Sequence, residues 1–267
     1  LIAATVISTQ GYGSPATALV GSTQDPVAAA RESKLQPGSH RLMVVGNSVA
    51  YFLAGEGFAR LQTSPPYVSL NAATLACNFP PVQEVRFADD AVPVPGMECR
   101  DSWAKGVADF NPDVVLMTLG DAGNIQYQHD GGWLKPCDPR YAPFHLHALA
   151  QARDALTSRG ARLVLTTSAY SRLLVNDVNA VRKQTDCVNA LNGKFAADHT
   201  DVGIIDLRKY VCPTYQTCRT QLDGFELRPD GVHYRDRSAV AIARWMLPQL
   251  GLRDGPTRSI ASSTPAP

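Results

Sequence analysis

The sequence predicts an α/β fold, a three-layer sandwich in which a parallel sheet of roughly five strands lies between helices. Short apolar runs bounded by Gly, Asp or Pro alternate with longer segments of helical period. Val114–Leu119 is continuously apolar, which is typical of a strand buried on both faces. Such alternation favours β–α–β units with helices on both faces of one sheet.

The first predicted strand covers residues 41–45, and the helix after it covers 48–62 and ends before Pro65-Pro66. The remaining core elements are expected as strands 67–71, 114–119, 162–167 and 202–206 and as helices 144–159, 176–198 and 238–250. Prolines and mixed polar residues predict irregular loops at Phe79–Gly96 and Gly123–Pro143. The second loop follows a strand's carboxyl end, where open α/β sheets bind ligands.

A chain of 267 residues accommodates one such domain, which we place at residues 41–252. Residues 1–40 are rich in small polar residues and predict a linker or N-terminal extension with one short helix near 25–34. Leu1–Ile7 is too short to span a membrane, and it reads equally as the end of a membrane helix or as a strand or tail. Residues 253–267 are expected to form a disordered tail.

The charge pattern and the histidines argue against several kinds of partner. A net charge of +1 offers no electrostatic footprint for nucleic acid. No cysteine or histidine spacing indicates zinc, so we expect neither a metal nor another cofactor. Five histidines lack a partner at ligand spacing and are expected at the surface or in loops: His40, His129, His145, His147 and His199.

One segment near the first strand carries the pattern of a nucleophile. The run Leu42-Met-Val-Val-Gly-Asn-Ser-Val-Ala50 reads as strand, tight turn and helix, with Ser48 at the helix start. Such a turn presents a hydroxyl at the carboxyl edge of a sheet, beside N–H groups that stabilise an oxyanion. Far downstream, Asp230-Gly-Val-His233 supplies an acid and an imidazole. Each motif has a plainer alternative, a capped helix start for the first and a solvated turn for the second.

Further blocks appear in a fixed order between these two motifs. They are Asn71-Ala-Ala-Thr-Leu-Ala-Cys77, Cys99-Arg-Asp-Ser-Trp103 and Val211-Cys212 with Cys218, and the last motif sits within Leu227–Tyr234. Together the blocks resemble the SGNH (GDSL-like) serine hydrolase family over roughly residues 40–250. A narrower resemblance is to the extracytoplasmic SGNH domains at the C-terminus of bacterial membrane acyltransferases of the acyltransferase-3 type.

The resemblance implies a catalytic triad of Ser48, Asp230 and His233. It also implies an oxyanion hole built from the backbone amides of Ser48 and Ala76. Asn124 could add its side-chain amide to this hole, or it could instead cap the following segment. Three positions depart from the family pattern. Asn47 stands where the family has Asp, Ala76 replaces a Gly, and Gly120-Asp-Ala-Gly-Asn124 replaces Gly-x-Asn.

Six cysteines form an even set, and sequence alone leaves their pairing open. The family pattern implies Cys77–Cys99 and Cys212–Cys218, which leaves Cys137–Cys187. Paired cysteines would place the domain in the periplasm or outside the cell, tethered to the cytoplasmic membrane if the narrower resemblance holds. The alternative is six free thiols in a cytosolic protein.

The function implied is a serine-dependent O-acyltransferase that moves a short acyl group, acetyl first, to a hydroxyl of a cell-envelope glycan or glycolipid. A membrane acyltransferase domain, expected in the same polypeptide, would deliver the acyl donor. The alternatives are an SGNH carbohydrate esterase or deacetylase and a catalytically weak glycan-binding module. Trp133, Tyr127 and Tyr170 are expected either to stack on a sugar or to serve only in packing. Phosphate binding at the Gly46–Ser48 turn is disfavoured because a P-loop's glycines and lysine are missing.

Overall fold

The computed structural model describes residues 39–61, 67–87, 92–100, 102–120, 123–172 and 177–252. Its centre is a five-stranded sheet in the order β2-β1-β5-β8-β9, and every neighbouring pair is parallel. These strands are β1 His40–Gly46, β2 Tyr67–Asn71, β5 Val114–Thr118, β8 Arg162–Thr166 and β9 Val202–Ile205. The predicted α/β class and all of its core strands are therefore confirmed. The helix expected near 25–34, the segment Leu1–Ile7 and the tail 253–267 lie outside the described residues.

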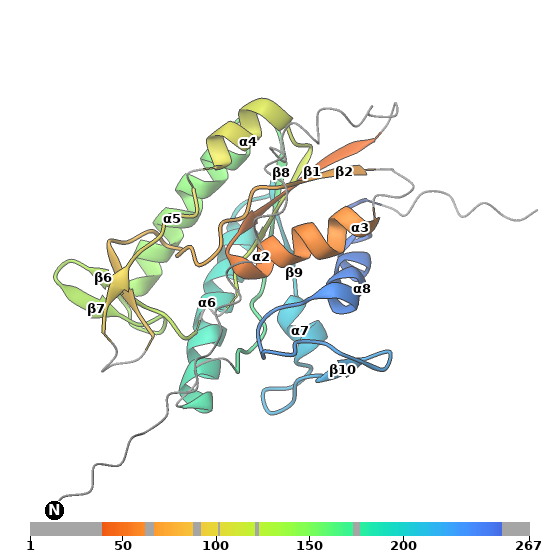
Figure 1. Ribbon diagram of the computed structural model, residues 1–267. Helices are drawn as coiled ribbons and strands as arrows, with labels where there is room; N and C mark the ends of the chain where they lie inside the picture. Colours follow the sequence, from red (N-terminus) through yellow and green to blue (C-terminus); the bar gives the residue numbers. More distant parts are fainter. Residues whose placement is uncertain are drawn as a thin grey trace, which may run out of the picture.

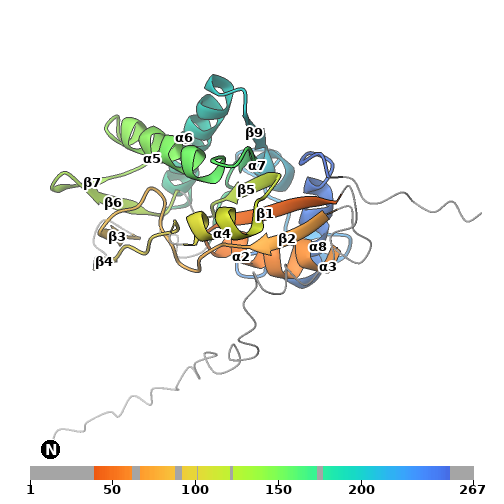
Figure 2. The same cartoon turned by 90° about the horizontal axis from the view of Figure 1, so that it is seen from above.

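Helices cover both faces of the sheet (Figure 1, Figure 2). One face carries the continuous helical segment α2 Ser48–Phe52, η2 Leu53–Phe58 and α3 Ala59–Leu61, together with α8 Asp236–Met246. The other face carries α4 Trp103–Phe110, α5 Tyr141–Leu156 and α6 Val178–Asp198. Successive strand residues point to opposite faces, so Leu42 and Val44 join one core and Met43 and Val45 join the other. None of the helices in the described ranges is long and apolar enough to cross a membrane.

The two loops predicted at Phe79–Gly96 and Gly123–Pro143 contain strands, so that prediction was wrong. They form a second, antiparallel sheet in the order β4-β3-β6-β7. Its strands are β3 Glu84–Arg86, β4 Val94–Pro95, β6 Gln126–His129 and β7 Gly132–Leu134. At two to four residues each they are too short to show a period in the sequence. A hairpin signal was nevertheless present, because Asp130-Gly131 takes positive φ at both positions, as a tight hairpin turn requires.

Three short elements of the C-terminal half and one helix were also not expected. Helix α4 precedes β5, and α7 Leu207–Val211 follows β9. A small hairpin then pairs β10 Gln221–Leu222 with β11 Phe225–Glu226 across an Asp223-Gly224 turn. The site-bearing segment 227–234 lies between this hairpin and α8.

The structure contains three disulfides, and they join the pairs that the resemblance implies: Cys77–Cys99, Cys137–Cys187 and Cys212–Cys218. The first links the segment after β2 to the approach to α4. The second fastens the loop between β7 and α5 to α6, and the third closes the loop that follows α7. Three disulfides fit a secreted or extracytoplasmic domain.

Removing the disulfide that spans the most residues should lower the free energy of unfolding more than removing the one that spans the fewest. Cys137–Cys187 joins residues 50 apart in sequence, whereas Cys212–Cys218 joins residues 6 apart. Loop-closure entropy then predicts losses of about 4 kcal/mol for the Cys137→Ser/Cys187→Ser variant and about 2 kcal/mol for Cys212→Ser/Cys218→Ser. Urea unfolding of both variants measures the difference, and a larger loss for the short loop would contradict it.

Candidate active site

The sheet has one topological switch point, between β1 and β5. The chain leaves β1 to form β2 on one side of it and returns to form β5 on the other. The carboxyl ends of β1 and β5 lie side by side, with Gly46 paired to Thr118. Ligands of open α/β sheets bind in the crevice outside such a point. Ser48 begins α2 immediately after β1, so it lies at this crevice.

The turn that holds Ser48 is built around a glycine. Gly46 has a φ of +132°, and a Cβ placed there would lie 1.9 Å from the carbonyl oxygen of Thr118. No larger residue fits without moving one of the two strands. The Gly46 carbonyl also accepts a hydrogen bond of 2.9 Å from the Thr74 N–H, which fixes the segment after β2 against the turn.

Asn47 fastens the turn to the end of the neighbouring strand. Its side-chain oxygen accepts hydrogen bonds from the N–H groups of Val49, at 3.2 Å, and Gly120, at 3.0 Å. Its side-chain nitrogen donates to the Gly120 carbonyl at 2.9 Å. An ionised Asp could accept these bonds but could not donate to that carbonyl. In this buried position the amide therefore satisfies one more backbone group than a carboxylate would.

The structure brings together Ser48, His233 and Asp230, which are the residues that the sequence analysis assigned to the site. His233 Nε2 lies 2.7 Å from Ser48 Oγ, and His233 Nδ1 lies 2.6 Å from Asp230 Oδ2. The other Asp230 oxygen accepts from the N–H groups of Val232, at 2.9 Å, and His233, at 2.8 Å. This chain of hydrogen bonds joins a hydroxyl, an imidazole and a carboxylate in the order that nucleophilic catalysis requires.

The electrostatic environment keeps Asp230 ionised. Partial burial acts to raise the pKa of this carboxyl, but hydrogen bonds from the backbone and ring of His233 and from the Val232 N–H outweigh burial and lower the pKa. A carboxylate at Nδ1 selects the tautomer whose Nε2 is free to accept the Ser48 proton. The hydrogen bonds therefore place Ser48 Oγ where a neutral imidazole could accept its proton.

Phe52 packs against the imidazole of His233, a contact that the sequence analysis did not predict. Its ring meets the His233 ring edge-on, with centroids 5.1 Å apart. The guanidinium carbon of Arg235 lies 3.9 Å from the centre of the Phe52 ring. Arg235 Nε also forms an ion pair with Glu56 Oε1 at 2.9 Å. Phe52 lies four residues after Ser48 on the same helical face, so the spacing alone could have indicated it.

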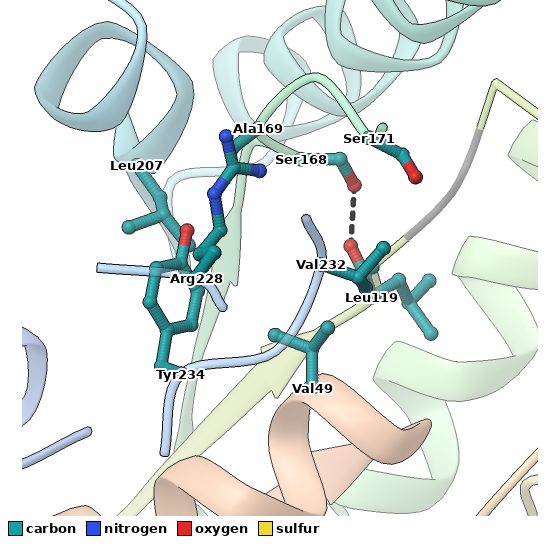
Figure 3. Close-up of a pocket in the computed structure, with 10 residues that line it drawn as sticks. Val49, Leu119, Ser168, Ala169, Ser171, Leu207, Arg228, Val232 and Tyr234 are labelled. Atoms are coloured by element: carbon teal, nitrogen blue, oxygen red, sulfur yellow. Dashed lines mark hydrogen bonds between the residues drawn. The ribbon is translucent and has the colours of Figure 1, made fainter. Parts of the chain in front are cut away.

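A small cavity is lined by Val49 and Val232, which are sequence neighbours of Ser48 and His233, and by the buried side chain of Arg228 (Figure 3). The Arg228 side chain extends toward the 168–171 loop, where its guanidinium donates to the Tyr170 carbonyl at 2.8 Å. Burial lowers the pKa of this guanidinium. Ser168 Oγ donates to the Leu119 carbonyl across the same cavity. Arg228 thus joins the segment that carries Asp230 and His233 to the loop after β8, although sequence reasoning gave it no role.

Ser48 lies at the turn and the segment that carries Ala76 contacts it, but donation by their amides to an oxyanion stays a prediction. Ala76 belongs to the segment whose Thr74 and Cys77 both contact the Gly46 carbonyl. It adopts a left-handed conformation, with a φ of 58°. Asn124 is buried between β5 and β6. The backbone of Ala76 therefore takes the conformation that its expected glycine would favour.

Ala76→Gly should stabilise the protein. A residue with a Cβ is strained by roughly 1–2 kcal/mol in the left-handed region, and glycine relieves this strain. Glycine also raises the conformational entropy of the unfolded chain, which offsets part of the gain. We expect a net gain of about 0.5–1 kcal/mol in the free energy of unfolding, measured by urea denaturation. A loss of stability would show that the Ala76 methyl makes a contact worth more than the strain.

The other singled-out histidines and aromatic residues lie elsewhere. His145 was expected at the surface or in a loop, and that was wrong, because it is fully buried in α5. Its Nδ1 lies 3.1 Å from the Tyr141 hydroxyl, and its Nε2 lies 2.8 Å from the side-chain oxygen of Asn192. Burial lowers the pKa of His145 to about 4, so it is a neutral core residue.

Tyr127 and Tyr170 are buried, and their hydroxyls donate to the Phe79 carbonyl and to Asp186, which supports the packing interpretation. The remaining histidines, His40, His129, His147 and His199, are exposed or half-buried, and the described residues contain no group of three or more potential metal ligands.

The fold is shared with two solved structures. A proposed acylhydrolase from Bacteroides fragilis superposes with a TM-score of 0.52 and 11% identity, covering 86% of this chain and 95% of its own. A GDSL-like lipase from Bacteroides thetaiotaomicron gives a TM-score of 0.51 and 11% identity, covering 82% and 91%. No family model and no curated protein sequence matches the chain. The chain therefore has the α/β fold found in a GDSL-like lipase, with Ser48, His233 and Asp230 linked at the carboxyl edge of its sheet.

Proposed function

We propose that this domain is a serine-dependent O-acyltransferase that carries a short acyl group as an ester of Ser48. The observation that carries the proposal is the hydrogen-bonded chain from Ser48 through His233 to Asp230 at the switch point of the sheet. The fold shared with the GDSL-like lipase supports ester chemistry. The resemblance of the motif blocks to the acyltransferase-fused domains supports transfer.

In the first half-reaction Ser48 Oγ attacks the carbonyl carbon of the donor ester while His233 Nε2 accepts the hydroxyl proton. The negative charge on the resulting tetrahedral oxygen is stabilised by N–H groups at the start of α2 and, as proposed above, by the amide of Ala76. The bond to the leaving oxygen then breaks, and His233 returns the proton to that oxygen. An acyl-Ser48 ester and a free alcohol result.

In the second half-reaction an acceptor hydroxyl attacks the acyl-Ser48 carbonyl, and His233 Nε2 takes the acceptor's proton. Collapse of the tetrahedral intermediate returns that proton to Ser48 Oγ. Throughout, Asp230 stabilises the imidazolium by its contact with Nδ1. If water is the acceptor the enzyme is an esterase, and if a sugar hydroxyl is the acceptor it is a transferase.

The acceptor that we propose is a hydroxyl of a cell-envelope glycan or glycolipid. Ser48 is half-buried, and the side chains of His233 and Asp230 are 16% and 42% exposed, so a large acceptor can approach them. A membrane acyltransferase domain in the same polypeptide would supply the acyl group, with the domain tethered outside the cytoplasmic membrane. Carbohydrate esterase or deacetylase activity is the second candidate, and the same exposure favours it because water also reaches Ser48.

The proposal is tested by offering an acetyl ester donor together with candidate envelope glycans and measuring acetyl transfer and acetate release separately. We expect acetylated glycan to accumulate at the expense of free acetate, and neither product with the Ser48→Ala variant. Acetate release that no glycan changes would make the enzyme an esterase. No turnover by either route would leave only the binding-module alternative.

A further inference from the structure

The first half of α6 extends past the carboxyl edge of the central sheet. This helix has 21 residues, about 31 Å, whereas the adjacent β8 has 5 residues, about 17 Å. Because α6 follows β8, it begins at the edge where Ser48 lies. Figure 1 shows its projecting half between the β6–β7 hairpin on one side and the β10 hairpin with α7 on the other.

Two hollows flank this projecting half, and they meet on the helix. One has a volume of about 550 Å³ and lies between α6 and Tyr215, and the other, of about 410 Å³, lies between α6 and Trp133. Ala180 and Lys183 line both hollows. Each volume is in the range of small-ligand sites. We refer to these two hollows and the ridge between them as the α6 surface.

The walls of the α6 surface are held by covalent and hydrogen bonds. Cys137–Cys187 fastens the loop after Trp133 onto α6. Cys212–Cys218 closes the loop that carries Tyr215, and the Tyr215 hydroxyl donates to the Asn179 carbonyl at 3.0 Å. The surface is therefore preformed, which lowers the entropic cost of binding a ligand.

The carboxylates that line this surface form hydrogen bonds or ion pairs within the protein, whereas one of its lysines does not in the part of the chain that the structure describes. Asp177 caps α6 by accepting from the N–H groups of Asn179 and Ala180, Asp186 accepts from the Tyr170 hydroxyl, and Asp138 pairs with Arg140. Lys183 is exposed, and no residue in the described ranges pairs with its ammonium group. The carboxylates are thus engaged within the protein, and the cation at the meeting point of the two hollows is available to a ligand.

The chemistry of the α6 surface matches a sugar chain. Trp133 is half-buried with the Arg86 guanidinium 4.5 Å from its ring centre, which leaves an amphipathic ring at the wall of one hollow. Tyr215 places a second ring at the wall of the other hollow. Sugar rings present C–H groups to aromatic faces and hydroxyls to polar side chains. Sites of this kind combine an apolar lining with a few placed polar groups.

We propose that the α6 surface binds an oligosaccharide that crosses α6, with one sugar against Trp133, another toward Tyr215 and an anionic substituent, carboxylate or phosphate, at Lys183. As a binding site this inference stands on the α6 surface alone. As the subsite that holds the acceptor while Ser48 transfers the acyl group, it rests on the proposed function.

Binding is measured by calorimetry at low salt with three probes: an oligogalacturonate, a phosphorylated oligomannoside and a neutral xylo-oligosaccharide. Lys183→Gln should weaken binding of one or both anionic probes about tenfold, and added salt should do the same. The matched control is Lys194→Gln, an exposed lysine farther along α6 whose only described partner is Asp198, which should bind as the wild type does. Trp133→Ala should also weaken binding about tenfold, and Trp133→Phe should restore part of it.

Absence of wild-type binding to both anionic probes at about 10 mM, a concentration at which even weak sites fill, would overturn the proposal. So would equal affinities of Lys183→Gln and Lys194→Gln, or tighter binding of the neutral probe. Circular dichroism of each variant establishes that it is folded. The Ser48→Ala variant should bind the anionic probes as the wild type does, so a failure of binding and a failure of the acyl-transfer chemistry are recorded by different experiments.

Discussion

Replacing either Ser48 or His233 with alanine should abolish hydrolysis of p-nitrophenyl acetate. The two side chains are 2.7 Å apart across the nucleophile–base hydrogen bond, so each variant removes one partner of the proton transfer. From the losses typical of serine triads, we expect kcat to fall by about 10⁶ for each. Steady-state kinetics measures the loss, and the double variant should lose little more than either single one because the pair acts as a unit.

Asp230→Asn should lose less, about 10⁴, because this residue orients and stabilises the imidazole rather than reacting. Two exposed residues of α5 and its C-terminal turn provide matched controls, His147→Ala and Ser158→Ala, which should leave the rate unchanged. Most of the activity surviving in Ser48→Ala would remove Ser48 from the role of nucleophile.

Gly46→Ala should be among the most damaging single substitutions for stability. The new Cβ would lie 1.9 Å from the Thr118 carbonyl oxygen, which belongs to the paired backbone of β5 and cannot move without breaking the sheet register. We expect a loss of about 4 kcal/mol or more in the free energy of unfolding. Thermal and urea denaturation measure it, and ester hydrolysis should fall in parallel because the same turn holds Ser48.

Gly160→Ala is the control for this substitution. Gly160 also has a positive φ, of +86°, but a Cβ there meets no atom within 4 Å. It should therefore cost only the backbone strain, about 1 kcal/mol. Equal losses at positions 46 and 160 would show that the approach of Gly46 to Thr118 is looser than the structure has it.

The central fold could be predicted from the sequence because its strands are buried on both faces. Val114–Thr118 has no exposed residue, so its apolar run is continuous and is bounded by recognisable turn residues. The second sheet was missed because β3, β4 and β7 have three residues or fewer, and pairing rather than composition defines them. The Asp130-Gly131 and Asp223-Gly224 turns were readable hairpin signals.

The site shows the same division between local and long-range information. Ser48, Asp230 and His233 were predicted as a set because two short motifs, each weak alone, stand in the order of the family that the chain resembles, and the structure brings their side chains together. The bonds between Asn47 and Gly120 could not be read in this way, since they depend on β5 lying beside β1. Arg228 and His145 are polar residues whose burial follows from tertiary packing, which no local pattern reports.

Labelling with a fluorophosphonate tests most directly whether Ser48 is an activated nucleophile. The reagent forms a covalent phosphonyl ester with a serine whose proton is removed by a neighbouring base, and peptide mass mapping identifies the serine. We expect one adduct, on Ser48, with labelling absent in Ser48→Ala and strongly slowed in His233→Ala. A folded wild-type protein that forms no adduct, or forms one at another serine, would contradict the assignment of Ser48, His233 and Asp230 as the catalytic residues.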